Sequence, residues 1–283
     1  MGKLRYFKNL DALRAFAAIA VIVAHYFDAS RMGEGSRIAK ISLLGNSGVS
    51  LFFVLSGFVI TRILINSTQS SGYFSSFYIR RTLRIFPLYY FSLLCYWYLP
   101  GLINKTTAMH SFSAADFYFV FYLQNFARTF NWIQTGPGHF WSLAVEEHFY
   151  LIWPAVVYFA LKKNLQLLTW LSIAIIIIIH LVRVLMFKDG YNINFFTFTR
   201  LDQLVMGGLI AIIERKGYLD EKFRRQYFAL FIAGLFGVAF IEFQNDPLIK
   251  EVLKHKAFGF LFAGMIMLAV IFVVAFGQLS IDL

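Results

Sequence analysis

Charged residues are scarce in this chain: they make up 14% of its 283 residues, against about 25% in a typical soluble domain. Hydrophobic residues make up 59% of the sequence. This composition excludes an ordinary soluble globular protein and leaves no separate soluble domain. It predicts one all-α domain over residues 1–283, a polytopic bundle of transmembrane helices.

Cysteine is almost absent, because Cys95 is the only one in the chain. One thiol cannot form an intrachain disulfide and is a poor metal site. The six histidines are dispersed and no acidic cluster accompanies them, so we expect no metal and no bound cofactor. The net charge of +11 does not indicate nucleic acid, because the basic residues are scattered between apolar segments, where they first report membrane topology.

Long apolar runs, in contrast, are abundant, and about eight of them could cross the ~30 Å hydrocarbon core of a bilayer. They cover residues 10–28, 48–65, 85–104, 140–161, 165–187, 196–213, 226–243 and 257–276. With the N-terminus in the cytoplasm, more Lys and Arg residues fall on the inner side than on the outer, including 80-RRTLR-84 and 222-KFRR-225. The aromatic segment 116–130 is shorter, and we expect it to be interfacial or re-entrant. If it crossed the membrane, the orientation of every later helix would be reversed.

The first apolar run contains Arg14 and His25, about 16 Å apart along a helix axis and on one face of it. Each has an ordinary explanation: the arginine could extend to the membrane surface, and the histidine could form hydrogen bonds at the interface. Together they indicate the two ends of a polar cavity. A neutral imidazole is a suitable proton acceptor near pH 7.

Two further runs contain residues that suit either packing or binding. Ser56 and Gly57 remove bulk in the middle of a span, which lets another helix or a ligand come close. Arg80, Arg81 and Arg84 precede an apolar run. They could anchor the chain on the cytoplasmic side, or bind phosphate, because guanidinium groups match phosphate oxygens.

The segment 141-WSLAVEEHFYLIWP-154 contains two adjacent carboxylates, Glu146 and Glu147, near the start of a span. Glu146 shares a helix face with Ser142 and Tyr150, whereas Glu147 points about 100° away. One carboxylate could therefore face a cavity while the other faces a neighbouring helix or lipid headgroups.

Arg200 and Asp202 are too close in sequence to face each other on a helix, so each should pair with another helix. The sequence allows Asp202 to pair with an arginine, and Arg200 to pair with Glu146 or Glu147. Three further polar residues are interpreted as interfacial: His180, Arg183 and Glu242.

Five of these stretches, taken in order, resemble the acyltransferase 3 family of integral membrane O-acyltransferases. They are 10-LDALRAFAAIAVIVAHY-26, 51-LFFVLSGFVI-60, 80-RRTLRIFP-87, 140-FWSLAVEEHFYLIWP-154 and 200-RLDQLVMGGLIA-211. The first has the family's pattern of Arg, ten residues and His. The resemblance runs from about residue 8 to the end of the chain.

The resemblance implies a bundle of about ten spanning helices. It implies transfer of an acyl group, commonly acetyl from cytoplasmic acetyl-CoA, to a hydroxyl of a sugar or another acceptor. Products in the family include O-acetylated lipopolysaccharide, exopolysaccharide, nodulation factors and macrolides. The expected partners are therefore an acyl-CoA donor, a saccharide or lipid-linked glycan acceptor and membrane lipids, in a bacterial cytoplasmic (inner) membrane.

The resemblance also assigns roles to residues. His25 is expected to be the base, with Arg14 and Glu146 as further catalytic residues and the arginine cluster 80–84 as the donor-phosphate site. An acetyl-histidine relay is the competing mechanism. The expected support for substrate or structure comes from Ser56, Gly57, Trp141, Ser142, Glu147, Arg200 and Asp202.

The last residues, 277-GQLSIDL-283, resemble the beginning of a late family motif in which Tyr is usual where Ile281 stands. In the family two more helices follow, so the sequence leads us to expect a C-terminally truncated domain. The alternatives to an enzyme are a proton-coupled transporter or flippase, which the same buried polar residues would suit, and an inactive remnant.

Overall fold

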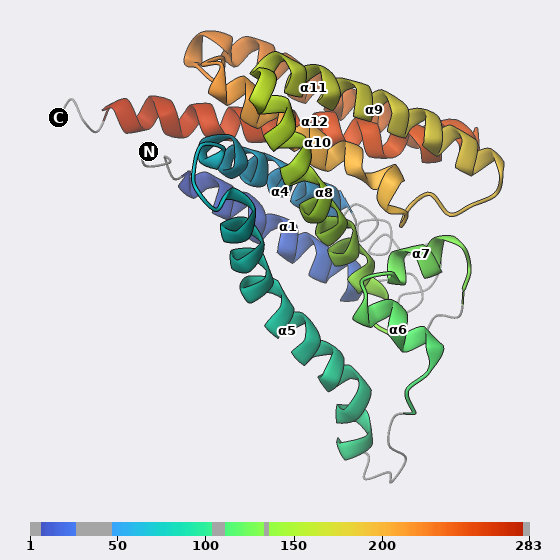
Figure 1. Cartoon of the computed structure of the whole chain (residues 1–283). Helices are drawn as coiled ribbons and strands as arrows, with labels where there is room; N and C mark the ends of the chain where they lie inside the picture. The colour runs from blue at the N-terminus through green and yellow to red at the C-terminus, as the bar shows by residue number, and fades with distance from the viewer. Residues whose placement is uncertain (1–6, 27–46, 104–110, 133–135, 280–283) are drawn as a thin grey trace.

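A computed structural model describes residues 7–26, 47–103, 111–132 and 136–279 (Figure 1). Within these residues all regular secondary structure is helical, as the composition predicts. The helices are α1 (Lys8–Tyr26), α4 (Ser47–Ser67), α5 (Tyr73–Ile103), α6 (Ala114–Val120), α7 (Gln124–Thr129), α8 (Trp141–Lys163), α9 (Leu165–Lys188), α10 (Thr197–Arg215), α11 (Arg224–Glu242) and α12 (Pro247–Leu279), with short 3₁₀ turns at Gly138–Phe140 and Glu221–Phe223.

Each of the eight predicted spans falls on one long helix of this structure. The largest difference is at α5, which begins at Tyr73 rather than near residue 85. Gly72, with a φ of 82°, turns the chain just before it, and no Gly or Pro interrupts the helix until Pro87. The arginine cluster 80–84 is therefore helical and lies on a packed element.

Four of the described helical segments are long and apolar enough to cross a membrane on their own: Ser47–Ser67, Leu165–Lys188, Glu221–Glu242 and Pro247–Phe272. The chain is thus an integral membrane protein. Helices α1, α5, α8 and α10 carry more polar residues, and their crossing of the bilayer stays a prediction.

Helix α4 lies at the centre of the bundle and packs most extensively against α10. The two backbones meet at Gly57 and Gly207: a methyl group on Gly57 would collide with the Leu204 carbonyl, and one on Gly207 with the Val54 carbonyl. Small residues permit such close helix contact in membranes, where dispersion forces and fit drive association. Gly57 therefore serves helix packing rather than a ligand.

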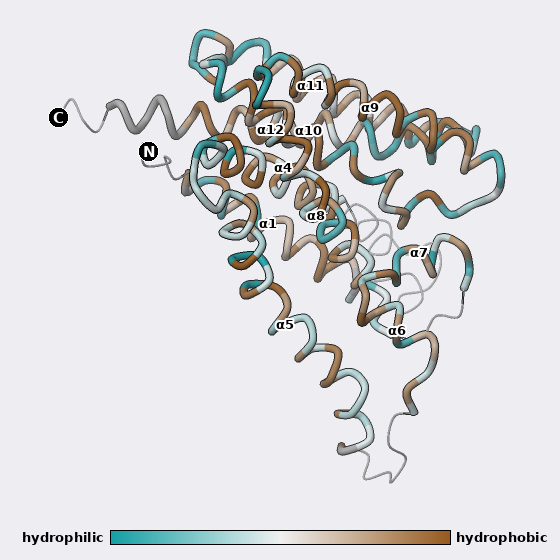
Figure 2. The backbone as a smooth tube through the Cα atoms, viewed as in Figure 1, coloured by the Kyte–Doolittle hydropathy of each residue, from teal (hydrophilic) through white to brown (hydrophobic). Residues whose placement is uncertain are grey.

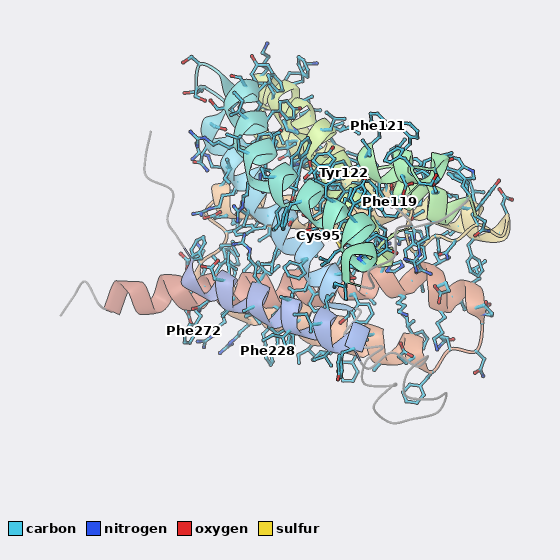
Figure 3. All side chains as sticks on the ribbon, turned by 90° about the horizontal axis from the view of Figure 1, so that it is seen from below. Cys95, Phe119, Phe121, Tyr122, Phe228 and Phe272 are labelled. Carbon is cyan, nitrogen blue, oxygen red and sulfur yellow. The ribbon has the colours of Figure 1, made fainter. Side chains whose placement is uncertain are left out.

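The outer helices present apolar side chains to their surroundings. Helix α9 is predominantly hydrophobic along its length, and Trp170, Ile178 and Leu185 are exposed on it (Figure 2). Phe228 of α11 and Phe272 of α12 are likewise exposed and lie on the outer side of the bundle (Figure 3). These apolar faces suit contact with lipid tails, because their exposure to water would be unfavourable.

The segment 116–130 forms two short helices, α6 and α7, of 7 and 6 residues. Tyr122 lies between them with a φ of 58°, so the chain turns there. Helices of this length extend about 10 Å, which is too short to cross a bilayer. The structure therefore agrees with the prediction that this segment does not span, and the orientation of the later helices in the membrane stays a prediction.

Candidate functional site

A cavity of about 580 Å³, here called the central cavity, lies among α1, α4, α5 and α8. Seven of the residues selected from the sequence line it: Arg14, Ser56, Arg81, Arg84, Trp141, Ser142 and Glu146. They come from four helices that are distant in sequence. The structure thus brings most of the predicted site together around one space.

Glu146 is the carboxylate that faces this cavity. It accepts a hydrogen bond of 2.7 Å from the Tyr150 hydroxyl, one helical turn away, and one of 3.1 Å from Ser56 Oγ on α4. Tyr150 is buried, so the pair is shielded on that side. Two hydroxyl donors fix the orientation of the carboxylate, which gives Ser56 a concrete supporting role.

The arginines of the central cavity retain access to its interior. Arg14 forms an ion pair of 3.0 Å with Asp11, and its side chain is 38% exposed. The Arg81 guanidinium lies 5.0 Å above the Tyr150 ring and 5.9 Å from the Phe77 ring. An arginine held by aromatic faces keeps its N–H donors free to bind an anion.

A second cavity of about 510 Å³, the basic mouth, joins the central cavity at the end of α4 near Ser67. Arg81, Arg84 and Ile63 line both cavities. Arg80 lines only the basic mouth, together with the hydroxyls of Ser67, Ser70, Ser71 and Ser76. The three predicted phosphate-binding arginines are therefore gathered on one opening.

His25 belongs to α1, but its side chain lies outside the residues that the structure describes. Arg14 and Val21 of the same helix both line the central cavity. Position 25 follows Val21 by about one turn and so belongs to the same stripe of α1. The role of His25 as base stays a prediction.

Glu147 and Asp202 are among the predicted residues that do not line the central cavity. For Glu147 this is expected from its different helix face. Asp202 forms a buried ion pair of 2.8 Å with Arg183 of α9. This is one of the pairings that the sequence allowed.

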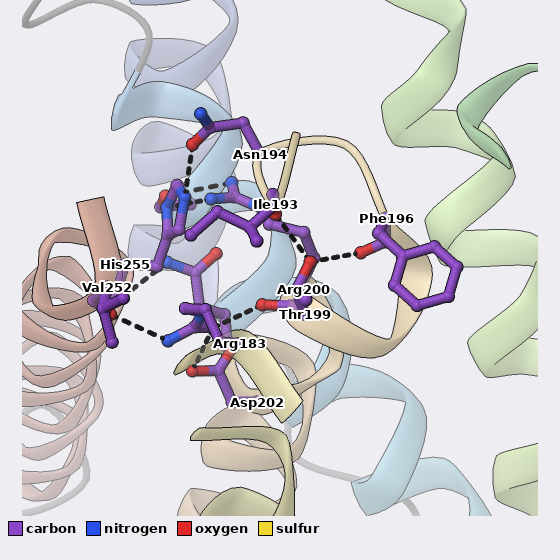
Figure 4. Close-up of polar contacts among 11 residues, drawn as sticks. Arg183, Ile193, Asn194, Phe196, Thr199, Arg200, Asp202, Val252 and His255 are labelled. Atoms are coloured by element: carbon purple, nitrogen blue, oxygen red, sulfur yellow. Dashed lines mark hydrogen bonds and ion pairs between the residues drawn. The ribbon is translucent and has the colours of Figure 1, made fainter. Parts of the chain in front are cut away.

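The interfacial interpretation of Arg183 is wrong. Its side chain is 0% exposed, and it donates to the Val252 carbonyl at 3.3 Å and to the Thr199 carbonyl, in addition to Asp202 (Figure 4). A guanidinium has five donors, so it can bind carbonyls of two helices together with one carboxylate. The prediction failed because the polar partners come from two other helices, α10 and α12, whose approach to α9 cannot be read from the sequence.

Arg200 does not pair with Glu146 or Glu147. It contacts His255 Nδ1 (Figure 4). Ser50 Oγ lies 3.5 Å from Arg200 Nη2. Arg200 lines a third cavity of about 520 Å³, here called the polar pocket, which shares Trp141 with the central cavity.

Sequence reasoning missed His139 and His255. Exposed His139 lines both the central cavity and the polar pocket. Buried His255 holds Asn194 through Nε2 at 2.8 Å. His255 stands between Lys254 and Lys256, just before the predicted span 257–276, so the sequence did not mark it as buried. Nor could the sequence show which helix supplied its partner.

A family model described as an acyltransferase domain matches residues 7–282. The O-acetyltransferase OatA of Staphylococcus aureus is 32% identical over 227 residues, which cover 74% of this chain and 35% of that protein. The peptidoglycan O-acetyltransferase OatA of Listeria monocytogenes is 30% identical over 224 residues, 74% of this chain and 34% of that protein. The chain thus spans about a third of the length of these relatives. No solved structure matches it.

Proposed function

Because the chain belongs to the acyltransferase 3 family, we propose that it is a membrane O-acetyltransferase. It transfers acetyl from acetyl-CoA to a hydroxyl of a cell-envelope saccharide. One observation carries this proposal: the central cavity combines an oriented carboxylate with arginines from two helices and continues into the basic mouth.

The donor binds from the side of the basic mouth. Arg80, Arg81 and Arg84 supply guanidinium groups for the phosphates of coenzyme A, and bidentate contacts to phosphate are the strongest that arginine forms. The pantetheine arm then extends into the central cavity, past Ile63, which lines both spaces. This orientation places the basic mouth and the N-terminus in the cytoplasm, in agreement with the positive-inside rule.

The chemical step forms one bond and breaks another. The acceptor oxygen attacks the thioester carbonyl, a C–O bond forms, and the C–S bond breaks. His25 takes the hydroxyl proton and then protonates the departing thiolate, so it returns to its neutral form. In the relay alternative the imidazole itself holds the acetyl group between the two substrates.

Arg14 and Glu146 act on this step from opposite walls. The Arg14 guanidinium stabilises negative charge on the thioester oxygen as the bond to the acceptor forms. Glu146, held by Ser56 and Tyr150, positions cationic groups in the cavity rather than serving as the base. Each of its oxygens accepts one hydrogen bond, which fixes the carboxylate and leaves its negative charge to attract the cavity arginines.

The acceptor class rests on the relatives. The Listeria protein is named a peptidoglycan O-acetyltransferase, so we propose a glycan of the bacterial envelope as acceptor. Cell-wall glycan and lipid-linked saccharide are the two forms to test.

The test is acetyl transfer in membranes that contain the chain, with acetyl-labelled acetyl-CoA and an envelope glycan fraction. We expect label in the glycan, and none with His25→Ala. His180→Ala on α9, outside the three cavities, is the matched control and should retain transfer. Arg84→Gln should raise the KM for acetyl-CoA, whereas Arg215→Gln at the end of α10 should not.

Full transfer in His25→Ala would overturn the assignment of the base. If the wild-type chain neither labels glycan nor releases acetate, the same assay on a form extended at the C-terminus separates an incomplete site from a wrong function. Failure of both well-folded forms would contradict the enzyme and favour a transporter.

A further inference from the structure

The polar pocket lies at the opposite end of α4 from the basic mouth. Ser47 and Ser50, at the start of α4, line the polar pocket, whereas Ser67, at its end, lines the basic mouth. Val49, His139 and Trp141 line both the polar pocket and the central cavity. The three cavities thus follow one another along a helix of 21 residues, a length of about 30 Å.

The polar pocket contains a buried cation that the described residues do not neutralise. Arg200 is 3% exposed, and no carboxylate in the described part of the chain forms an ion pair with it. Its guanidinium lies 5.4 Å from the Trp141 ring and 5.3 Å from the Phe53 ring, and its Nε has no hydrogen-bond partner. Nearby Asp202 is already bound to Arg183.

The rim of this pocket adds further positive charge. Arg128 lies 3.7 Å above the Phe195 ring and donates to the Gly138 carbonyl at 2.7 Å, and Lys254 forms no ion pair with a described carboxylate. Against these cations stands Glu251, which accepts a hydrogen bond of 3.0 Å from Asn194. An uncompensated buried charge is costly, so a site of this kind favours an anionic ligand.

The remaining lining suits a sugar. Trp141 and Phe195 supply aromatic surface, and Asn192 and Asn194 supply amides that can both donate to and accept from hydroxyls. Trp141 also borders the central cavity, so a hydroxyl of a ligand in the polar pocket can reach the proposed acetyl donor with little movement.

We propose that the polar pocket is the acceptor subsite, and that it selects a saccharide carrying a carboxylate or a phosphate next to the hydroxyl to be acetylated. Arg200 binds the anionic group from below, and Arg128 and Lys254 bind it from the rim. The role as acceptor subsite rests on the proposed acetyl transfer, but the preference for an anionic ligand can be measured without catalysis.

The test is equilibrium binding to the purified chain in detergent. Three probes are compared: a disaccharide containing glucuronate, its neutral counterpart containing glucose, and a sugar diphosphate on a short polyprenyl chain. We expect at least one anionic probe to bind about tenfold or more tightly than the neutral one, less so at high salt. Tighter binding of the glucuronate probe indicates an acidic polysaccharide, and of the diphosphate a lipid-linked precursor.

Charge removal at the rim sharpens the test. Lys254→Gln and Arg128→Gln should each weaken the anionic probe several-fold and leave the neutral probe unchanged. Lys256→Gln is the matched control, because it alters the same residue type on the same helix outside the pocket. In transfer assays the rim variants should raise the KM for the acceptor and not that for acetyl-CoA.

Equal binding of charged and neutral probes would overturn the proposal, as would anionic binding that neither rim variant weakens. A charge preference without acetyl transfer would support the subsite and contradict only the proposed enzyme. Acetyl transfer to neutral and anionic glycans with the same KM would support the proposed enzyme and contradict the anionic acceptor subsite.

Discussion

Two groups of arginines in this protein differ in their surroundings: one is buried and paired within the chain, and the other lines a cavity. In the interior between α9, α10 and α12, Arg183 is sealed from solvent and bound to Asp202 and two backbone carbonyls. In the central cavity, Arg14 is more than a third exposed, and Arg81 rests on aromatic rings. The first charge is neutralised by a carboxylate of the chain, whereas no ion pair to Arg81 is present among the described residues and Arg81 has donors left for a ligand.

The difference teaches where to look for function in a membrane bundle. A charged residue inside a span is a functional candidate by default, but a fully buried one that forms an ion pair with another helix is better explained as a link between helices. The Arg183–Asp202 pair is of that kind. The charged residues of the central cavity instead border open volume, which is the condition for binding.

The largest expected effect comes from breaking the Arg183–Asp202 pair. Arg183→Leu leaves the Asp202 carboxylate buried without its partner, which should cost about 3–5 kcal/mol of folding free energy. The measurement is the yield and unfolding midpoint of the protein in detergent. The double variant with Asp202→Leu should recover much of the loss, and a single variant as stable as wild type would contradict the structural role.

In the central cavity, Glu146→Gln should instead reduce activity and spare the fold. The amide oxygen can accept from one of the two hydroxyls and the amide NH2 can donate to the other, but the negative charge is lost, and we expect kcat to fall about 100-fold, or ~2.7 kcal/mol. Steady-state acetyl transfer measures this. Glu147→Gln, one residue on and outside the cavity, is the matched control and should show a much smaller loss.

The close contact between α4 and α10 can be tested by a change in side-chain size alone. Gly57→Ala forces a methyl group against the Leu204 carbonyl and should cost about 2 kcal/mol in stability. Gly237→Ala on α11 places a methyl group at 3.7 Å from Ala257 Cβ, an ordinary contact, and should be neutral. Similar unfolding midpoints for the two variants would show that the helices can separate without loss.

The smallest effect is expected at Ser56. Ser56→Ala removes one donor to Glu146 and leaves the Tyr150 hydroxyl in place, so the carboxylate loses about 1 kcal/mol of support. Activity should fall a few-fold, with stability nearly unchanged. The double variant Ser56→Ala/Glu146→Gln should be no worse than Glu146→Gln alone, and additive losses would show that Ser56 acts independently.

The helices and much of the central cavity could be predicted from the sequence. Long apolar runs determine the eight main helices, and the helical period put Glu146 and Tyr150 on one face, which the structure shows. Arg14 and Glu146 were selected because charge is rare in such runs, and both line the central cavity.

What the sequence could not supply is the choice of partner between helices. Arg183 and His255 have partners far from them along the chain, and the geometry depends on how closely α4, α10 and α12 approach. That approach is controlled by glycines such as Gly57, whose effect on packing has no sequence period. The start of α5 was missed for a related reason: its first turns are polar, and hydropathy marks only the apolar part.

The partition at Trp141 has an electrical consequence. A water-filled path along the whole of α4 would short-circuit the ion gradients of the cell. The indole, with Phe53 and Arg200 packed against it, lines both the polar pocket and the central cavity and forms part of the wall that they share. In the proposed reaction the acetyl group passes this partition in one direction and the hydroxyl proton passes in the other. No net charge crosses, so the membrane potential, worth about 2.3 kcal/mol per charge per 100 mV, neither drives nor opposes the transfer. The proposed reaction can therefore transfer acetyl across a polarised bilayer without dissipating the membrane potential.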